Sequence, residues 1–514
     1  MGSFHALGTN LLLTYPRTTV LGTTISLVFI YIAYQLVWHP VARFPGPRLA
    51  ALSNVWRFIH QEEMAALLPR LHEQYKSPII RIGPNHLHVG DSRHHHDIYR
   101  NQNKILKDPA FYLRMGLAGS IVSETDPRRH QALAALMTPV LNQKAIDQRF
   151  DILVSKADMT GRAIYDAVER DEPVGVQKLF ARATWDIISI ICLGTDPRLT
   201  DNFREKALVL DEIEMFMKTI KYVTLIPGLC DLVLVLPEWL IGPVLSGYAR
   251  FRKRTVNLAL EAAKNFLARG SSGDSEQQSI IDRLVEPHLS KDVDLETNLK
   301  ALPLTEIVGH SYVLLLAGTE TTALTLTGIM YHLCKHTEYK RQIRKELREL
   351  GDPDGPEYPW EKAVRTPSLD NFAKEGLRMG SPVTAVLPRV TPRDGARIGD
   401  DHIPANVVVG GNIGMANHDP AIFSEPNRFA PERWEGEAGK SLNQHMVSYT
   451  EGSRRCIGRS LADIQIRLIL AKLVLAFDFD LDNPTWDIDD WEDRSTKAFR
   501  TPLMLRASKI NSHA

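Results

Sequence analysis

Tyr449-Thr450-Glu451-Gly452-Ser453-Arg454-Arg455-Cys456-Ile457-Gly458 surrounds one of the four cysteines of the chain with glycines and arginines. Gly452 and Gly458 allow the backbone to approach a bulky group closely, which a residue with a Cβ would prevent. Arg454 offers a permanent cation to an anionic group of a cofactor. The helix expected over Arg459–Phe477 points its first amides at the sulfur and favours a thiolate. A cysteine in a glycine-bounded turn would explain any one of these features but not all of them, so we expect Cys456 to ligate a metal.

The other three cysteines and the composition indicate an ordinary globular protein from a reducing compartment. Cys192, Cys230 and Cys334 lie in or beside apolar runs, as buried structural cysteines do. The 514 residues are 44% hydrophobic and 24% charged, which is ample for a large core. Lys+Arg and Asp+Glu both number 61, so the chain lacks the cationic excess of a nucleic-acid binder.

The N-terminal stretch Thr18–Trp38 contains no charged side chain and is long enough to span a bilayer as a helix. Three arginines follow it, at Arg43, Arg48 and Arg57, and this cationic excess places the rest of the chain in the cytosol. A cleaved signal peptide fits less well, because the apolar run is long and lacks a small-residue cleavage site. A buried core helix is the other alternative.

The remainder of the chain predicts one large, mainly α-helical domain with small β-sheets. The segments expected to be helical are Ala145–Arg170, Val176–Leu193, Arg204–Thr219 and Gly247–Arg269. Strand signals occur over Ile79–Val89 and Thr384–Val409. The apolar segment Thr224–Leu245 is interrupted by prolines and acidic residues, and it fits a membrane-dipping loop, a substrate-channel loop or an ordinary core connection.

A second motif, Ala317-Gly318-Thr319-Glu320-Thr321-Thr322, lies within a helix expected over Leu304–His336. That helix is nearly all apolar, so it should cross the core, and Glu320 argues against a second membrane span. Gly318 and the threonines predict a locally loosened helix, since glycine weakens a helix interior and threonine can bond back to the preceding turn. Desolvation should raise the pKa of Glu320, which suits proton delivery to bound dioxygen.

A third pattern is the pair Glu375 and Arg378, which share one helix face. A second arginine, Arg433, lies in the segment Phe429-Ala430-Pro431-Glu432-Arg433-Trp434. It could share Glu375 and complete a buried network beneath the cofactor. Alone, the pair would be read as a solvated salt bridge.

Three consecutive histidines, His94, His95 and His96, invite a metal site. Adjacent side chains point in different directions, so we expect these histidines at the surface.

In this order along the chain, the motifs resemble the cytochrome P-450 superfamily of haem-thiolate monooxygenases over most of residues 20–505. The resemblance implies the cytochrome P-450 fold with an axial thiolate from Cys456 on haem b. It also implies that Glu320 and Thr321 form an acid–alcohol pair and that Glu375, Arg378 and Arg433 form a structural triad. The groups expected around the haem, propionate ligands among them, are Arg454, Arg389, His130, Gly452 and Gly458.

Two residues depart from the pattern of that superfamily. Tyr449 replaces the usual phenylalanine, which adds a hydroxyl near the proximal face. Ala134 replaces an expected propionate-binding arginine, so haem retention would rely on Arg454, Arg389 and His130. The segment 107–112 and the region of His130 are similar to fungal secondary-metabolite enzymes of the trichodiene oxygenase type.

The expected protein is a single-pass enzyme of the endoplasmic reticulum membrane with a cytosolic catalytic domain. Its segments are a lumenal tail (1–17), a transmembrane anchor (18–38), a Pro-rich hinge (39–52) and the haem-binding catalytic domain (53–510). It would insert one oxygen atom from O2, by hydroxylation or epoxidation, into a lipophilic terpenoid, polyketide or alkaloid. Electrons would come from NADPH through a partner reductase, because the chain has no convincing dinucleotide fingerprint.

The reductase could dock on a cationic face made by Arg455, Arg459, Arg467 and Lys472, or these could be ordinary solvated charges. The family resemblance places the substrate pocket at 111–123, 309–322, 383–387 and 496–499. Two other functions remain open: an oxygen-independent haem-thiolate isomerase or dehydratase, and a non-catalytic haem-binding membrane protein.

Overall fold

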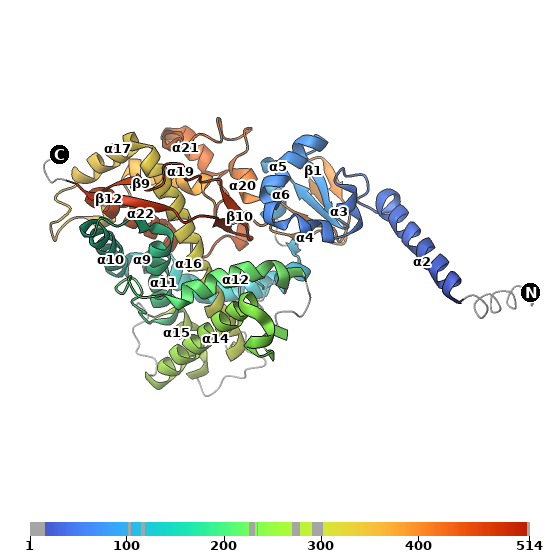
Figure 1. Cartoon of the computed structure of the whole chain (residues 1–514), viewed down its shortest axis with the longest axis horizontal. Helices are drawn as coiled ribbons and strands as arrows, with labels where there is room; N and C mark the ends of the chain where they lie inside the picture. The colour runs from blue at the N-terminus through green and yellow to red at the C-terminus, as the bar shows by residue number, and fades with distance from the viewer. Residues whose placement is uncertain are drawn as a thin grey trace, which may run out of the picture.

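The computed structural model describes residues 16–100, 104–114, 119–225, 232–233, 235–269, 278–289 and 302–510. Figure 1 shows a helical body with small sheets and one helix, α2, that extends away from it at the N-terminal end. The prediction of a mainly α-helical chain with small β-sheets is confirmed. The expected lumenal tail lies almost entirely outside the described residues, and Cys230 lies outside them as well.

The α-helices account for most of the ordered chain. They are α2 (Pro16–Ala33), α3 (Arg48–Leu52), α4 (Val55–Ile59), α5 (Met64–Tyr75), α6 (His95–Tyr99), α7 (Pro109–Tyr112), α8 (Pro127–Leu141), α9 (Gln143–Asp147), α10 (Phe150–Glu169), α11 (Val176–Leu193), α12 (Leu208–Leu225), α14 (Glu238–Arg269), α15 (Ile280–Val285), α16 (Leu304–Lys335), α17 (Thr337–Arg348), α18 (Trp360–Ala363), α19 (Pro367–Met379), α20 (Ile413–Asn417), α21 (Gly436–Asn443) and α22 (Arg459–Ala476).

The described strands form four small sheets. The largest has the order β1-β2-β8-β5-β3, and the others are β4-β12-β9, β10-β11 and β6-β7. Their bounds are β1 (Ile79–Gly83), β2 (His86–Val89), β3 (Leu106–Lys107), β4 (Val174–Gly175), β5 (Arg389–Val390), β6 (Ala396–Ile398), β7 (Asp401–Ile403), β8 (Val408–Gly410), β9 (Phe477–Leu481), β10 (Trp491–Asp493), β11 (Lys497–Phe499) and β12 (Met504–Lys509). In the largest sheet Lys107 pairs directly with Arg389, which places two cations side by side.

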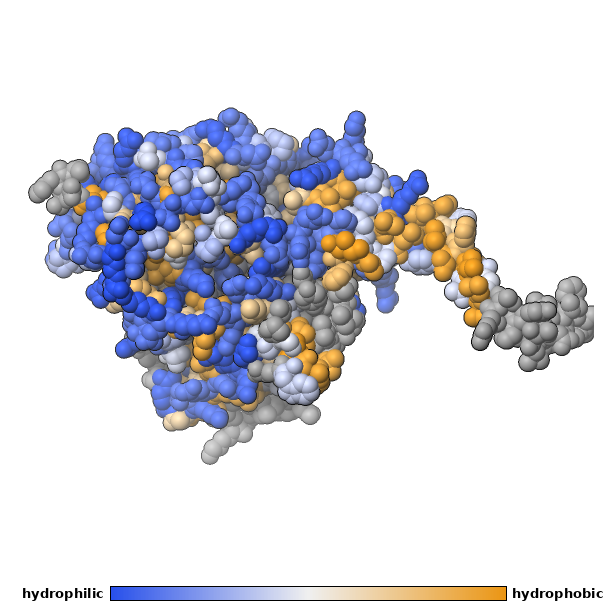
Figure 2. Space-filling view, viewed as in Figure 1, coloured by the Kyte–Doolittle hydropathy of each residue, from blue (hydrophilic) through white to orange (hydrophobic). Residues whose placement is uncertain are grey.

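The N-terminal helix α2 continues into a π-helical turn over Tyr34–Trp38. The apolar stretch Thr19–Trp38 is long enough to cross a membrane, and only 6% of it is buried in the protein. Figure 2 shows its exposed apolar surface in orange. At its inner end Arg81 donates to the carbonyl and side-chain oxygens of Gln35, at 2.6 and 2.7 Å, so the body is attached directly to the helix.

Helix α16 crosses the body and contacts α11, α14, α19 and α22. It is one unbroken α-helix, so the expected local loosening at Gly318 is absent from this described segment. A Cβ at Gly318 would lie 2.7 Å from Cγ1 of Ile188, on α11. Glycine is therefore needed here for close helix packing, and the adjoining threonines bond back to their own helix without opening it.

Two helix boundaries differ from the sequence-based prediction. The expected helix 145–170 is divided into α9 and α10, because the Arg149 guanidinium donates to the carbonyls of Ala145 and Gln278 at the junction. The helix expected from residue 204 begins at Leu208. The preceding loop is held by buried Asp186, which accepts hydrogen bonds from the amides of Leu199 and Thr200.

Candidate active site

The cysteine loop, residues 449–458, contains a 3-10 turn over Gly452–Arg454 and leads into α22. The Cys456 amide donates to the Tyr449 carbonyl at 2.9 Å and so closes the loop. Gly452 has φ +71°, a left-handed conformation that L side chains rarely adopt, which explains the glycine at this position. At Gly458 an added Cβ would lie 4.0 Å from the sulfur, which is ordinary contact, so the sulfur itself does not require glycine there.

The Cys456 thiol borders space inside the protein. Its side chain is exposed, yet burial among protein atoms raises its pKa, while a hydrogen bond from the Gly458 amide lowers it. Both observations hold for a group that lines an internal cavity rather than the outer surface. The amide contact is the thiolate-stabilising interaction expected from the start of α22.

A second surface of the same kind lies in the middle of α16. Ala317 is exposed, and Glu320 and Thr321 are half-exposed, although most of this helix is buried. Desolvation by the surrounding protein raises the pKa of Glu320 to about 7, with a smaller contribution from Glu214 in the same direction. The Thr321 hydroxyl donates to the Ala317 carbonyl at 2.7 Å. This part of the helix therefore presents an acid and an alcohol to an interior space.

Four basic side chains gather near the cysteine loop: Lys107, His130, Arg389 and Arg454. Lys107 and Arg389 are paired on β3 and β5, and His130 lies on α8. Burial is the main cause that lowers the pKa of Lys107 well below its usual range, that of His130 to about 3 and that of Arg454 to about 10. Repulsion among these groups adds to each shift.

The hydrogen-bond acceptors around these cations are neutral in the described part of the chain. Arg389 donates to the Tyr112 hydroxyl at 2.8 Å, Lys107 donates to the Val122 carbonyl at 2.6 Å, and Arg454 donates to the carbonyls of Glu124 and Thr125. Glu124 and Asp126 offset part of the positive charge, and a largely buried cation cluster of this kind fits a ligand that carries carboxylates, as haem does.

Among the described residues, no group of three or more His, Cys, Asp or Glu side chains could hold a metal ion. The exposed thiol, the interior cavity surface and the cation cluster together fit a haem group.

Lys107 was not among the candidates from the sequence, and Tyr112 was included only as part of the predicted pocket segment 111–123. Ala134, which replaces the expected arginine, is partly buried against the core. Lys107 adds a basic side chain beside Arg389, and its Nζ lies 4.5 Å from the Tyr112 ring centroid. The Lys-Asp-Pro-Ala-Phe-Tyr segment was visible in the sequence, but only the β3–β5 pairing brings its lysine beside Arg389.

Glu375 and Arg378 lie on α19 and are fully buried, and Arg433 is nearly so. Arg378 donates to both carboxylate oxygens of Glu375 at 2.8 and 2.9 Å, and Arg433 donates at 3.0 Å. The backbone amide of Ala430 and the indole of Trp434 each donate at 3.0 Å as well. The carboxylate therefore accepts five hydrogen bonds and joins α19 to the segment before the cysteine loop.

The placement of the three histidines differs from the predicted surface position. His95 is 4% exposed and its ring stacks beside Tyr99 at 4.3 Å between centroids. His96 contacts Glu451 of the cysteine loop at 2.5 Å, which Arg100 also approaches at 3.3 Å. His96 therefore connects α6 to the cysteine loop, whereas His94 faces Asp91 and Asp97.

The proposed cationic docking face is reduced to two residues. Lys472 pairs with Asp158 at 2.5 Å, Arg467 pairs with Asp370 at 2.6 Å, and both side chains are largely buried. Arg455 and Arg459 remain exposed.

The comparisons with known proteins agree with this geometry. The family model described as Cytochrome P450 matches residues 44–502. Cytochrome P450 monooxygenase aneF of Aspergillus aculeatus is 28% identical over 456 residues, which cover 87% of this chain and 90% of the relative. Cytochrome P450 monooxygenase atr2 of Stereocaulon alpinum is 29% identical over 506 residues, which cover 93% of this chain and 92% of the relative.

The fold is similar to that of the crystal structure of the cytochrome P450DA heme domain. The TM-score is 0.71 and the sequence identity 18%, with 87% of this chain and 93% of that chain covered. At this identity the likeness supports the fold.

Proposed function

Because this chain belongs to the cytochrome P450 family of haem-thiolate monooxygenases, we propose that Cys456 supplies the thiolate that binds its haem iron. The observation that carries the assignment is the Cys456 thiol, which is accessible although protein atoms surround it and which receives a hydrogen bond from the Gly458 amide just before α22. Cys192 is fully buried and Cys334 half-buried, with pKa values that burial raises to about 12, so both thiols stay protonated.

We propose that Arg389, Arg454, His130 and Lys107 surround the haem carboxylates. Two carboxylates would supply the negative charge that this cluster lacks and would raise the pKa of Lys107 again. When bound, the haem activates dioxygen and supplies the oxygen atom that is inserted into a C–H or C=C bond of the substrate. Its electrons come from NADPH through a partner reductase, for which we propose Arg455 and Arg459 as docking residues.

Glu320 and Thr321 are proposed to deliver protons to the cavity. A carboxyl group with a pKa of about 7 is half protonated at neutral pH, so it can both release and regain a proton. The Thr321 hydroxyl already donates to its own helix, which leaves its oxygen lone pairs available to accept a hydrogen bond from the cavity side. The alcohol would therefore hold a proton donor in place while the acid replenishes the proton.

The proposed substrate is a lipophilic small molecule of secondary metabolism, such as a terpenoid, polyketide or alkaloid. Two predicted pocket segments meet at a bridge between Val383 and Thr496. Along the first segment Val383, Ala385 and Leu387 are half-buried whereas the residues between them are buried, so one apolar face borders open space. The similarity of 107–112 to fungal secondary-metabolite enzymes supports this class.

We further propose that 18–38 anchors the catalytic domain, 53–510, in the endoplasmic reticulum membrane through the hinge 39–52, with the domain in the cytosol. The exposed apolar span and the arginines that follow it support this orientation. Leu232, Val235 and Trp239 are also strongly exposed, which favours membrane contact for the Thr224–Leu245 segment. Carbonate extraction and protease protection of microsomes test the anchor and its orientation.

The decisive experiment is the absorption spectrum of the reduced, carbon-monoxide-treated protein. We expect the red-shifted Soret band of a thiolate complex, and we expect Cys456→Ser to abolish it while the control Cys334→Ser retains it. Retention of the band by Cys456→Ser would overturn the assignment. Product formation that requires both dioxygen and NADPH would separate a monooxygenase from an isomerase, and metabolite profiling after gene deletion would identify the substrate class.

A further inference from the structure

The hydroxyl of Tyr449 links the cysteine loop to a carboxylate on α22. It donates to Oδ1 of Asp463 at 2.7 Å. The carbonyl of the same tyrosine accepts the Cys456 amide at 2.9 Å. One residue thus contacts both the backbone of the proposed iron ligand and an acidic side chain in the second turn of α22.

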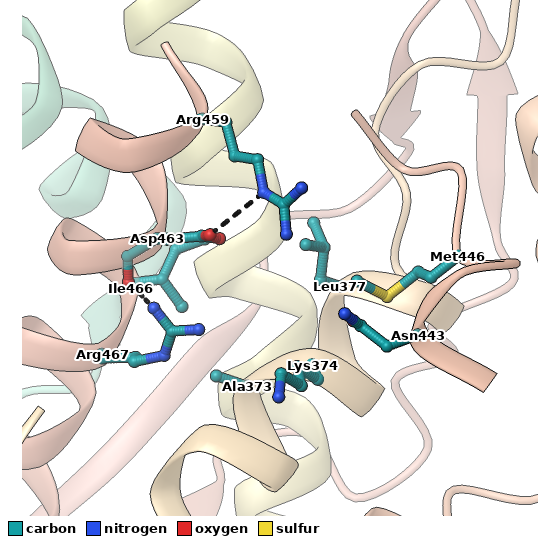
Figure 3. A pocket seen from close by; sticks show the side chains of 9 residues that line it. All are labelled: Ala373, Lys374, Leu377, Asn443, Met446, Arg459, Asp463, Ile466 and Arg467. Atoms are coloured by element: carbon teal, nitrogen blue, oxygen red, sulfur yellow. Dashed lines mark hydrogen bonds and ion pairs between the residues drawn. The ribbon is translucent and has the colours of Figure 1, made fainter. Parts of the chain in front are cut away.

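Besides Tyr449, the Asp463 carboxylate has one charged partner among the described residues, Arg459. Nε of Arg459 lies 3.5 Å from its Oδ2, and the Arg459 guanidinium lies 5.4 Å from the centroid of the Tyr449 ring. Figure 3 shows Arg459 and Asp463 on one helix, facing a pocket that Lys374 and Arg467 also line. The Asp463 side chain is 22% exposed, so solvent screens its charge only in part.

The other acidic group of this region is engaged elsewhere. Asp370 pairs with Arg467 at 2.6 Å and with Lys374 at 2.6 Å. Arg467 contacts only the backbone carbonyl of Asp463, at 3.2 Å. Of these two carboxylates, Asp463 is therefore the one hydrogen-bonded to the cysteine loop, whereas the described partners of Asp370 are Arg467 and Lys374.

The charges of this pair act on the sulfur in opposite directions. Asp463 brings a negative charge, hydrogen-bonded through Tyr449 to the cysteine loop, and Arg459 brings a positive charge at the start of the helix that follows the sulfur. A negative potential at the sulfur also opposes the addition of an electron to an iron bound there.

We propose that Asp463 is a positioning residue that keeps the reduction potential of the haem iron low, and that the Tyr449 hydroxyl holds its carboxylate in place. This inference rests on the proposed ligation of iron by Cys456. Arg459 partly offsets the effect. Tyr449 thereby acquires a function that the phenylalanine usual at this position cannot have, because a phenyl ring has no hydroxyl to bind the carboxylate.

The test is the midpoint potential of the ferric/ferrous couple, measured by spectroelectrochemistry on the full-length, haem-loaded protein. Asp463→Asn retains the size and the hydrogen-bond acceptor but removes the charge, so its potential should rise. Arg459→Gln should lower the potential. Asp370→Asn is the matched control and should leave the potential unchanged, because that carboxylate is neutralised by two cations and does not touch the loop.

Tyr449→Phe tests the part played by the hydroxyl. It should raise the potential less than Asp463→Asn does, because the charge remains but is no longer held in place. In the Asp463→Asn background the same change should have little further effect. An additive shift in the double variant would refute the role of Tyr449 as the anchor of Asp463.

The outcomes separate this inference from the proposed function. If wild-type protein lacks the thiolate band after reduction and treatment with carbon monoxide, the proposed ligation of iron by Cys456 is refuted. If the band is present but Asp463→Asn matches or falls below the wild-type potential, or Asp370→Asn shifts it equally, the inference alone is wrong. Should Asp463→Asn fail to retain haem, an unchanged or raised potential in Arg459→Gln would still overturn it.

Discussion

Replacement of Glu375 by alanine should destabilise the protein more than any exposed charge replacement. The carboxylate is fully buried and accepts two hydrogen bonds from Arg378, one from Arg433 and two from neutral donors. Its removal leaves two arginine side chains buried or nearly buried without their anion. Breaking such a network costs about 3–5 kcal/mol, because the remaining charge is uncompensated in a medium of low polarity.

The expected loss converts into a shift of the melting temperature. Unfolding entropy of about 2.1 cal/mol/K per residue gives about 1 kcal/mol/K for a chain of 514 residues, so Tm should fall by about 3–5 °C. Circular dichroism of the haem-loaded protein in detergent measures the shift. The matched control is Glu437→Ala, which removes the carboxylate of a strongly exposed pair with Lys440 and should leave Tm unchanged.

A melting temperature of Glu375→Ala within about 1 °C of wild type would refute the reasoning, since it would mean that the two arginines find other partners or water at little cost. An equal fall in both variants would also contradict it. Glu375→Gln is a useful intermediate, because the amide keeps the volume and accepts with one oxygen while the negative charge is lost.

Three further predictions concern the proposed haem site. Thr321→Ala should divert electrons into peroxide, so the hydrogen peroxide formed per NADPH consumed should rise several-fold; unchanged coupling would count against the proton-delivery role. Glu320 is protonated at pH values below its pKa of about 7 and deprotonated at higher pH. Turnover should therefore fall as the pH rises through about 7. Glu320→Gln should remove this inflection from the pH–rate profile. Lys107→Met should weaken haem retention by about 1.5–3 kcal/mol, the usual contribution of a charged hydrogen bond, and so speed haem transfer to apomyoglobin by roughly 10–150-fold. Lys440→Met, which replaces an exposed lysine, is the control, and equal transfer rates in the two variants would exclude Lys107 from the site.

Local chemistry in the sequence was sufficient to identify the family and the order of its motifs. The glycine and arginine pattern around Cys456, the apolar helix with an internal acid and the N-terminal apolar run each reflect properties of neighbouring residues. Such properties survive in any conformation, so they can be recognised without coordinates. Helix boundaries were harder to predict from the sequence, because they depend on contacts with distant residues. Arg149 contacts Gln278 at the junction of α9 and α10, and Asp186 holds the loop before α12 through Leu199.

What the amino-acid sequence determined by itself was the fold class, the membrane-spanning length and the cysteine set apart from the others. Only the tertiary structure decided that Lys107 joins Arg389, that Gly318 serves helix packing and that Tyr449 binds Asp463. The physical reason is that the electrostatic environment and the packing of a side chain depend on segments brought together by folding. The role of an individual side chain can therefore be assigned only when its neighbours in the folded chain are known.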